Sequence, residues 1–254
     1  MFERQQTLAD RYEVGPLIGF GGMGRVHRAH DLVLDRRVAI KFLSESHSDG
    51  AGLRRFRREA QMTARLGHES IVTTFDVVES ESLQARHEVA LVMELVEGPT
   101  LHQLLESGGT LSVGEAARWA SQIARGLAAV HAIGIVHRDL KPANLLIASD
   151  EQRLKIADFG IAALLADAPD SDPSAPSALP PSDLRARLTR AGTILGTPEY
   201  MAPERFVSNA VSPALDVYAL GAIVYEMLTG APPIVADSAA ELLAKLSSGP
   251  PKIA

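Results

Sequence analysis

The chain has 254 residues, of which 46% are hydrophobic and 22% are charged, so it can bury a sizeable core in one large domain or two lobes. Its 25 Lys and Arg residues against 31 Asp and Glu give a formal charge of −6, which argues against a nucleic-acid partner because nucleic-acid binders usually carry a basic stripe. The chain contains no cysteine, which excludes disulfides, thiolate zinc sites and cysteine nucleophiles.

The N-terminal residues do not resemble a signal peptide. Met1 to Gln6 lack the apolar core of a signal peptide, and no apolar run approaches the roughly 18 residues that cross a bilayer. We therefore expect a cytoplasmic chain with no membrane segment, which is compatible with an anchor on a longer parent protein. Residues 1–11 precede the first predicted strand and are expected to form an N-terminal tail.

Three strands are predicted between Tyr12 and about Leu43 from alternating apolar residues. The first two flank a group of glycines: Gly19, Gly21, Gly22 and Gly24. A dinucleotide-binding fold needs its glycines between a strand and a helix, so this hairpin position favours a flexible flap over phosphates. A plain Gly-rich hairpin fits the glycines equally well, but Val26 soon after them and Lys41 on the next strand strengthen the phosphate interpretation.

The segment from Leu53 to Leu66 repeats apolar residues at helical spacing and is predicted to be a helix. Glu59 lies within it and has two interpretations. It either forms a surface ion pair with a neighbouring arginine or holds the Lys41 amine towards nucleotide phosphates. The surrounding motifs favour the second interpretation.

Two further strands, Ile71–Val78 and Val89–Met93, are predicted on either side of a polar loop. Residues 94–98 then break the pattern and end in glycine, as expected of a hinge between two lobes. Backbone groups of Glu94 and Val96 suit hydrogen bonds to an adenine edge, although a simple strand end fits the same residues.

The chain becomes helical after the predicted hinge. Leu101–Glu106 is a short predicted helix, and a longer one runs to Ala132. Ser112 and Glu115 have the spacing of a capping box, which marks the start of the longer helix.

A charged stretch from His137 to Asn144 lies between two apolar segments, where rigid flanks would hold polar groups at a cleft. Asp139 can accept a proton from a hydroxyl, and Lys141 can neutralise negative charge that develops nearby. Asn144 and Asp158, which begins an Asp-Phe-Gly turn, both offer oxygen ligands to a hard cation. One base, one lysine and two oxygen ligands describe a site that moves a phosphoryl group from a metal-bound nucleotide to an alcohol.

Residues 166–184 combine several prolines with serine, alanine and aspartate and almost no large apolar residues, so we expect disorder there. Two roles fit this insert: a longer tether, since loop-closure entropy grows slowly with length, or a binding site for a partner. Beyond it, the sequence predicts a buried helix over Pro213–Thr229 and another helix over Ser238–Leu246.

Taken together, the motifs resemble those of eukaryotic-type (Hanks-type) serine/threonine protein kinases, and most closely their bacterial branch. The motifs are Gly19 to Val26, Val38-Ala39-Ile40-Lys41, Glu59, His137 to Asn144, Asp158-Phe159-Gly160 and Ala202-Pro203-Glu204. Their order and rough spacing match the family from about Tyr12 to about Lys245. The resemblance implies an α+β, bilobal protein-kinase fold with a small antiparallel-β lobe carrying one helix and a larger, mainly helical lobe. The implied boundaries are 12–93 for the small lobe, 94–98 for the hinge, 99–254 for the large lobe and 158–204 for the activation segment.

The resemblance also implies ATP and Mg²⁺ as cofactors, with Mn²⁺ as an alternative ion. In the family pattern, Lys41 holds the α- and β-phosphates and Glu59 orients Lys41. Asp139 receives the substrate hydroxyl, Lys141 lies beside the transferring phosphate, and Asn144 and Asp158 ligate the metal. The implied nucleotide-binding set is Ile18, Gly19, Gly21, Gly22, Gly24, Val26, Ala39, Lys41, Met93, Glu94, Val96 and Leu146.

Arg138 indicates regulation, because the corresponding arginine in the family binds a phosphorylated residue of the activation loop. Thr189 and Thr193 are the predicted phosphosites, and the alternative is that both are loop residues without a role. Thr197 is expected to make a structural contact to the catalytic loop. Protein substrates with Ser or Thr are the implied partners, and two kinase chains would pair for autophosphorylation in trans.

The predicted function is phosphorylation of protein Ser and Thr hydroxyls in signalling. A nucleotide-binding pseudokinase scaffold is the main alternative, because the family normally continues with further helices, so Glu204 is expected to lack its usual arginine partner within this sequence. A small-molecule phosphotransferase is disfavoured, because Gly196 to Tyr200 resembles the protein-substrate platform of protein kinases.

Overall fold

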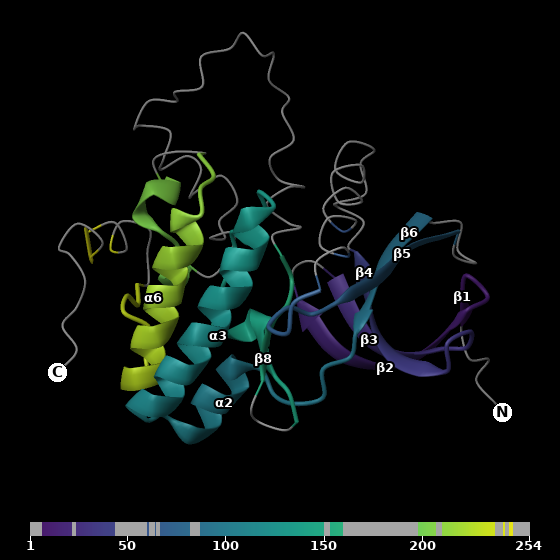
Figure 1. The fold of residues 1–254 in the computed structure, drawn as a ribbon, viewed down its shortest axis with the longest axis horizontal. Helices are drawn as coiled ribbons and strands as arrows, with labels where there is room; N and C mark the ends of the chain where they lie inside the picture. Colours follow the sequence, from purple (N-terminus) through teal and green to yellow (C-terminus); the bar gives the residue numbers. More distant parts are fainter. Residues whose placement is uncertain are drawn as a thin grey trace, which may run out of the picture. The chain divides into compact units, whose positions relative to one another are not determined.

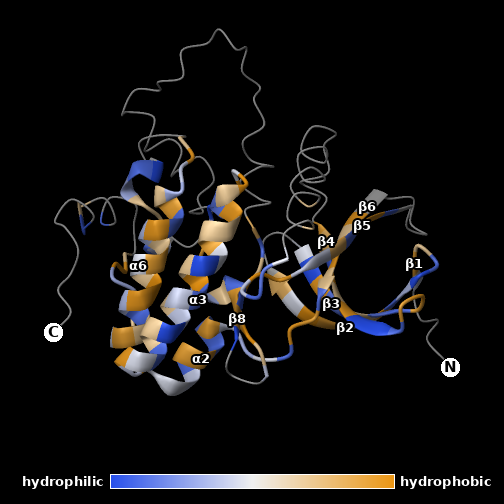
Figure 2. Ribbon diagram, viewed as in Figure 1, coloured by the Kyte–Doolittle hydropathy of each residue, from blue (hydrophilic) through white to orange (hydrophobic). Residues whose placement is uncertain are grey.

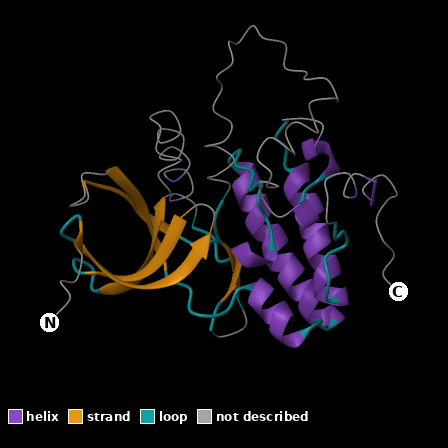
Figure 3. Ribbon diagram, turned by 180° about the vertical axis from the view of Figure 1, so that it is seen from behind, coloured by secondary structure: helices purple, strands orange, loops and turns teal. Residues whose placement is uncertain are grey.

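The structure, a computed structural model, describes residues 7–21, 24–43, 60, 64, 67–81, 87–149, 153–159, 198–206, 210–236, 241 and 244–245. The described residues up to Glu97 form one compact unit, and those from Gly98 onward form a second. The first unit is built from strands and the second mainly from helices, as Figures 1 and 3 show. The predicted pairing of an antiparallel-β unit with a mainly helical unit is thus present.

The first unit is a six-stranded antiparallel sheet with the strand order β1-β2-β3-β4-β6-β5. The strands are β1 (Thr7–Leu8), β2 (Tyr12–Gly21), β3 (Gly24–Asp31), β4 (Arg36–Leu43), β5 (Thr74–Glu81) and β6 (His87–Glu94). The sheet is strongly curled (Figure 1). The three strands predicted between Tyr12 and Leu43 are confirmed, and the glycines lie in the β2–β3 hairpin as expected.

Alternation along β4 explains how this sheet builds its core. Val38, Ile40 and Phe42 point to one face, where they pack with residues of β1, β2, β3, β5 and β6. The other members of this cluster are Leu8, Tyr12, Ala29, Val78, Ala90 and Val92. Val38 and Ile40 are 0% exposed, which is worth roughly 1.5–3 kcal/mol for each side chain. Ala39 and Lys41 therefore belong to the opposite face.

Two expectations about this unit are wrong. Residues 1–11 were expected to be a tail, but Thr7–Leu8 pairs with β2 and Leu8 is buried. A single apolar residue gives no periodic pattern, so the sequence could not indicate this strand. The polar loop after Val78 is also shorter than expected, because β5 and β6 stay paired out to Glu81 and His87. Ladder hydrogen bonds join backbone groups, so they continue past the point where apolar residues end.

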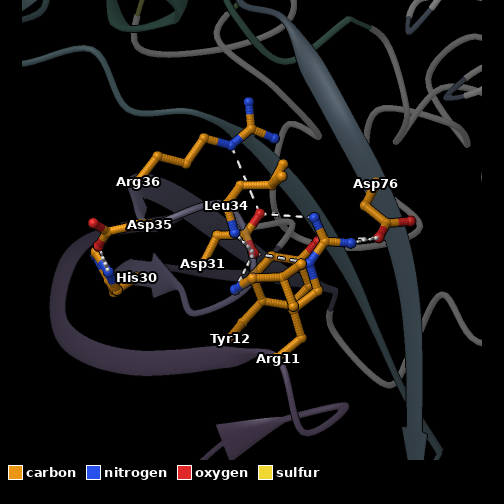
Figure 4. A network of polar contacts seen from close by, with 9 residues as sticks. Arg11, Tyr12, His30, Asp31, Leu34, Asp35, Arg36 and Asp76 are labelled. Carbon is orange, nitrogen blue, oxygen red and sulfur yellow. Dashed lines mark hydrogen bonds and ion pairs between the residues drawn. The ribbon is translucent and has the colours of Figure 1, made fainter.

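A charged network fixes the N-terminal end of the sheet (Figure 4). Arg11 donates from Nε and Nη2 to the two carboxylate oxygens of Asp31, both at 2.8 Å, and Asp31 is 0% exposed. The Arg11 hydrogen bond, with help from the backbone N–H of Leu34, lowers the pKa of Asp31 to about 2. The Tyr12 hydroxyl donates to Asp76 at 3.0 Å, and burial raises the pKa of Tyr12 to about 12.

The second unit contains three helices and a short hairpin among its described residues. They are α2 (Leu101–Gly108), α3 (Val113–Ala132), α6 (Ala214–Thr229), β7 (Leu145–Ile147) and β8 (Leu154–Ile156), with short 3-10 turns η2 (Pro142–Asn144), η3 (Pro198–Tyr200) and η4 (Pro203–Phe206). The predicted capping box is confirmed: Ser112 Oγ accepts from Glu115 N, and Glu115 Oε2 accepts from Ser112 N. Thr100 and Gln103 form the same arrangement at the start of α2.

Helices α3 and α6 lie side by side and form the core of this unit (Figures 1 and 3). The buried residues of α3 include Trp119, Ile123, Leu127 and Val130, and those of α6 include Leu215, Ala219, Ile223 and Met227. Hydrophobic residues run along most of α6 (Figure 2), but the predicted burial holds only in part, since Val217 is 62% exposed. Two polar residues, Asp216 and Glu226, are buried among these apolar side chains of α6.

Some predictions fall on residues that the structure does not describe. They are the activation-segment insert over 166–184, most of the helix predicted over 53–66, and most of the helix predicted over 238–246. Within the described ranges, no helix is both long enough and apolar enough to cross a membrane.

Candidate active site

The β7–β8 hairpin sets the positions of the two predicted metal ligands. Leu145 pairs with Ile156, so the residues that flank this rung also lie side by side. Ala157 N donates to Asn144 O at 2.9 Å, and Asp158 follows Ala157 directly. The hairpin therefore brings Asn144 to the start of Asp158, although 13 residues separate them in the chain.

Asp139, the predicted base, lies within this arrangement. Asn144 donates from Nδ2 to the backbone oxygen of Asp139 at 2.7 Å, and Lys141 Nζ lies 2.9 Å from Asp139 Oδ2. The side chains of Asp139 and Lys141 are 25% and 22% exposed, whereas Asn144 is 7% exposed. Asn144 thus anchors the loop, and the carboxylate and amine remain accessible to a substrate.

His137 ties the loop to the residues before Asp158. The ring is 0% exposed, and its Nε2 donates to Ala157 O at 2.9 Å. Because a carbonyl oxygen can only accept, the Nε2 atom carries the proton and Nδ1 is left to accept from Asp139 N, at 3.4 Å. The ring also packs on Phe159 with the centroids 5.0 Å apart. One buried histidine therefore contacts both the backbone of the charged loop and the Asp-Phe-Gly turn.

Two residues of the site have left-handed backbone conformations. Arg138 has φ 66° and Asp158 has φ 59°, a region that non-glycine residues seldom adopt and that costs about 1–3 kcal/mol for each. Such conformations persist only where surrounding contacts impose them, and they cluster at functional sites. Ala9, Asp10 and Asp35, in turns of the first unit, also have positive φ, so the strain at Arg138 and Asp158 supports a functional site only together with the contacts described above.

Asp216 supplies the contacts that hold the charged loop. This residue of α6 is 1% exposed, and its Oδ2 accepts from His137 N at 2.8 Å while Oδ1 accepts from Arg138 N at 2.9 Å. The loop is thus bonded to a buried helix, and the strained backbone of Arg138 is held in place. Asp216 has no predicted role in the sequence, although an acidic residue in the first turn of an apolar helix is a signal that could have indicated one.

In the first unit, the pairing of the strands places several of the predicted nucleotide-binding residues on the same face of the sheet. Gly19 pairs with Val26, and Val26 pairs with Lys41. Lys41 lies two residues from Ala39, which pairs with Met93. Directly opposed residues of an antiparallel sheet share a face, so these side chains point to the side opposite the apolar core. Lys41 is 3% exposed, which makes it a buried charged residue with a defined position.

Two glycines are required where the backbone approaches another chain segment closely. Gly24 has φ 140°, and a Cβ atom there would lie 1.8 Å from Phe42 O. A Cβ atom on Gly98 would lie 1.9 Å from Ile147 O. Any other residue would push these segments apart, so Gly24 keeps the β2–β3 hairpin against β4, and Gly98 keeps the start of the second unit against β7.

The family profile described as protein kinase domain matches residues 12–249, which is nearly the whole chain. The chain belongs to the protein kinase domain family. This kinase domain is 41% identical to serine/threonine-protein kinase PknA of Mycobacterium tuberculosis over 246 residues, which cover 96% of the chain and 53% of PknA. It is 39% identical to serine/threonine-protein kinase PknB of Mycolicibacterium smegmatis over 234 residues, which cover 92% of the chain and 35% of PknB. The chain therefore spans about a third to a half of the length of these curated relatives.

The family match confirms the resemblance to Hanks-type serine/threonine kinases of the bacterial branch. The structure places ten of the predicted site residues in the first unit of the kinase domain: Ile18, Gly19, Gly21, Gly24, Val26, Ala39, Lys41, Met93, Glu94 and Val96. It places the others that it describes in the second unit: Arg138, Asp139, Lys141, Asn144, Leu146 and Asp158. Gly22, Glu59, Thr189, Thr193 and Thr197 lie outside the described residues. The roles assigned to all of these residues stay predictions.

Tyr200, the last residue of the segment that resembles the protein-substrate platform, is hydrogen-bonded to α6. Tyr200, in η3, donates from its hydroxyl to Glu226 Oε2 at 2.7 Å, and both residues are buried. Burial raises the pKa of the Tyr200 hydroxyl and also raises the pKa of the Glu226 carboxyl. The end of the predicted activation segment is therefore joined to the same helix that carries Asp216.

Proposed function

We propose that this kinase domain transfers the γ-phosphoryl group of ATP to Ser and Thr hydroxyls of proteins. The observation that carries the proposal is the hydrogen-bonded set of Asp139, Lys141 and Asn144, which is joined through Ala157 to Asp158. The two relatives named as serine/threonine-protein kinases support the same chemistry.

Asp139 orients the substrate hydroxyl and receives its proton as the oxygen attacks the γ-phosphorus. The bond between that phosphorus and the β–γ bridging oxygen breaks, and ADP leaves. Lys141, 2.9 Å from Asp139, offsets negative charge on the transferring group. Lys41 holds the α- and β-phosphates. Because the transition state needs little covalent help, placement of these charges supplies most of the rate.

Asn144 and Asp158 fit a hard divalent cation. The Asn144 amide donates from Nδ2 to Asp139 O, so its other atom, Oδ1, is the one oriented to accept or to coordinate. Asp158 adds a carboxylate, and oxygen ligands of these two kinds suit Mg²⁺ and Mn²⁺. A bound ion would neutralise part of the negative charge on the phosphate groups of ATP.

Autophosphorylation of Thr189 or Thr193 is the regulatory part of the proposal. Arg138 has its backbone fixed by Asp216, so its guanidinium is presented from a rigid loop. A phosphate carries about −1.5 to −2 charge at neutral pH and pairs well with arginine. We further propose that the reaction occurs in trans, between two kinase domains.

The test is incubation of the chain with radiolabelled ATP, Mg²⁺ and a generic basic protein, followed by phosphoamino-acid analysis. Parallel samples contain a small polyol as the acceptor, and intact-mass measurement reports phosphate on the kinase itself. The proposal predicts label on Ser and Thr of the protein, none on the polyol, and added phosphate on the chain that Thr189→Ala with Thr193→Ala removes.

Other outcomes contradict the proposal in distinguishable ways. Tight ATP binding by calorimetry with no transfer would assign the chain to the pseudokinase scaffolds. Label on the polyol alone would assign it to the small-molecule phosphotransferases. Label on protein with no phosphate on the chain would remove only the autophosphorylation step.

A further inference from the structure

Strand β2 is irregular just before the glycines of the predicted phosphate flap, residues 19–24. Four residues of β2 lie between Val14 and Gly19, but two residues of β3 lie between the partners of these residues. The register shifts in two places, between Val14 and Leu17 and between Leu17 and Gly19. A β-bulge bends its strand and re-aims the residues beside it, and bulges are common next to active sites. The two shifts therefore set the direction in which β2 enters the flap.

A histidine of β3 supplies a hydrogen bond at the first of these shifts. Pro16 has no N–H group, so the backbone of β2 lacks a ladder donor at this point. The His27 ring donates from Nδ1 to Gly15 O at 3.0 Å. Because a carbonyl oxygen can only accept, the Nδ1 atom carries the proton. His27 is also paired with Leu17, so one residue of β3 contacts β2 on both sides of Pro16.

The position of the His27 ring is set by the apolar core of the sheet. The ring lies edge-on to Phe42 of β4, with the centroids 5.6 Å apart and an interplanar angle of 90°. Phe42 is buried and belongs to the apolar cluster. Val26 precedes His27 in β3 and is paired with Lys41, and successive residues of a strand point to opposite faces. The ring therefore acts on β2 from the face opposite the predicted nucleotide contacts.

The hydrogen bond from His27 favours one register for the end of β2. A slip of one residue moves every side chain of a strand to the other face of its sheet, and glycine-rich strands specify their register weakly. Ile18 and Gly19, which are assigned to the nucleotide site, belong to the part of β2 that such a slip would turn over. A side-chain anchor at Gly15, ahead of the glycines, opposes this slip.

We propose that His27 is a positioning residue for ATP, which fixes the bulge of β2 at Gly15 and so directs the flap over the phosphates. The proposal rests on the function proposed above. Because the ring lies on the face opposite Lys41, its loss weakens the contacts of the flap with the phosphates and leaves the adenine contacts in place.

Two variants separate the hydrogen bond from the bulk of the ring. His27→Leu removes the donor and keeps an apolar side chain against Phe42, whereas His27→Asn keeps an amide donor near the Nδ1 position. His30→Leu is the matched control, because His30 lies on the same strand and its Nε2 contacts Asp35 Oδ1 at 2.9 Å, at the end of β3 far from the flap.

Calorimetry with ATP and with adenosine, which has no phosphates, measures the effect. The dissociation constant for ATP should rise roughly fivefold in His27→Leu, the scale of one hydrogen bond, with less than about a twofold change for adenosine. His27→Asn should recover most of the affinity for ATP, and His30→Leu should bind both ligands as the unmodified chain does.

Two further measurements need no nucleotide. In His27→Leu, amide hydrogen exchange at residues 17–21 should rise, while exchange in β4 and β6 is unchanged. The nitrogen spectrum of the neutral His27 ring should show the proton on Nδ1, and a proton on Nε2 would overturn the proposal.

Equal losses of affinity for ATP and adenosine would show a general effect on the fold and overturn the proposal. A lower melting temperature with unchanged ATP affinity and unchanged exchange would do the same. If the unmodified chain bound no ATP, the proposed function would fail, and exchange at residues 17–21 would then decide the role of His27 separately. A rise in His27→Leu would support that role, and no change would refute it.

Discussion

The Asn144 amide donates to the backbone oxygen of Asp139 at 2.7 Å, so a single hydrogen bond sets the proposed metal ligand relative to the proposed base. Asn144→Ala should therefore affect both groups. We expect turnover to fall roughly 10²-fold or more, and the Mg²⁺ concentration for half-maximal rate to rise. Initial rates over a Mg²⁺ titration measure both quantities. A lower rate with an unchanged Mg²⁺ requirement would assign Asn144 to the loop alone and remove it from the metal site.

Lys41 is 3% exposed and lies on the face of the sheet opposite the apolar core. Lysine side chains are rarely buried to this extent unless they are paired or have a specific function. Lys41→Met keeps the length and most of the volume of the side chain, so we expect a folded protein with almost no phosphoryl transfer. The matched control is Lys155→Met, because Lys155 is also buried, at 8% exposed, in β8. Circular dichroism and the radiolabel assay should show both variants folded and only the control active. Equal turnover in both would remove Lys41 from the mechanism.

Gly24 has no room for a side chain, since a Cβ atom would lie 1.8 Å from Phe42 O. Gly24→Ala should lower the free energy of unfolding by more than about 1 kcal/mol. The control is Gly221→Ala on α6, where a Cβ atom meets nothing within 4 Å and alanine should stabilise by about 0.5–1 kcal/mol. Urea unfolding measures both changes. Equal stability of Gly24→Ala and the unmodified chain would mean that the β2–β3 hairpin does not lie against β4 as described.

The Arg11–Asp31 ion pair is expected to make the stability of the first unit depend on pH in the acid range. Its folded-state pKa of about 2 is below the unfolded value of about 3.9, so the stability from Asp31 is complete above the unfolded value and is lost as pH falls towards 2. Melting temperatures between pH 6 and 2 should fall less steeply for Asp31→Asn than for the unmodified chain. Parallel curves for the two proteins would show that this pair does not govern acid unfolding.

The sequence predicted the parts of this molecule that depend on local pattern or on fixed chemical groups. The alternation of apolar and polar residues predicted β2, β3 and β4, and the spacing of Ser112 and Glu115 predicted the start of α3. Lys41, Asp139 and Asn144 could be named from the sequence as candidates because phosphoryl transfer needs a base, a cation and oxygen ligands for a metal, and their roles stay predictions.

Other features depend on contacts between distant residues, which no local pattern records. The Asp216–His137 bond spans 79 residues, and the Arg11–Asp31 pair spans 20. The pairing of Thr7–Leu8 with β2 depends on one buried leucine. Such contacts hold the charged loop and the N-terminal end of the sheet in place. They can be identified only from the folded structure.

The central claim, that Asp139 is the base of a phosphotransferase, is tested most directly by single-turnover transfer from ATP to a protein substrate by Asp139→Asn. This variant keeps the size of the side chain and, at the backbone oxygen, the hydrogen bond from Asn144. The account predicts a rate at least roughly 10²-fold below that of the unmodified chain, with ATP affinity by calorimetry essentially unchanged. Transfer by Asp139→Asn at the rate of the unmodified chain would contradict it.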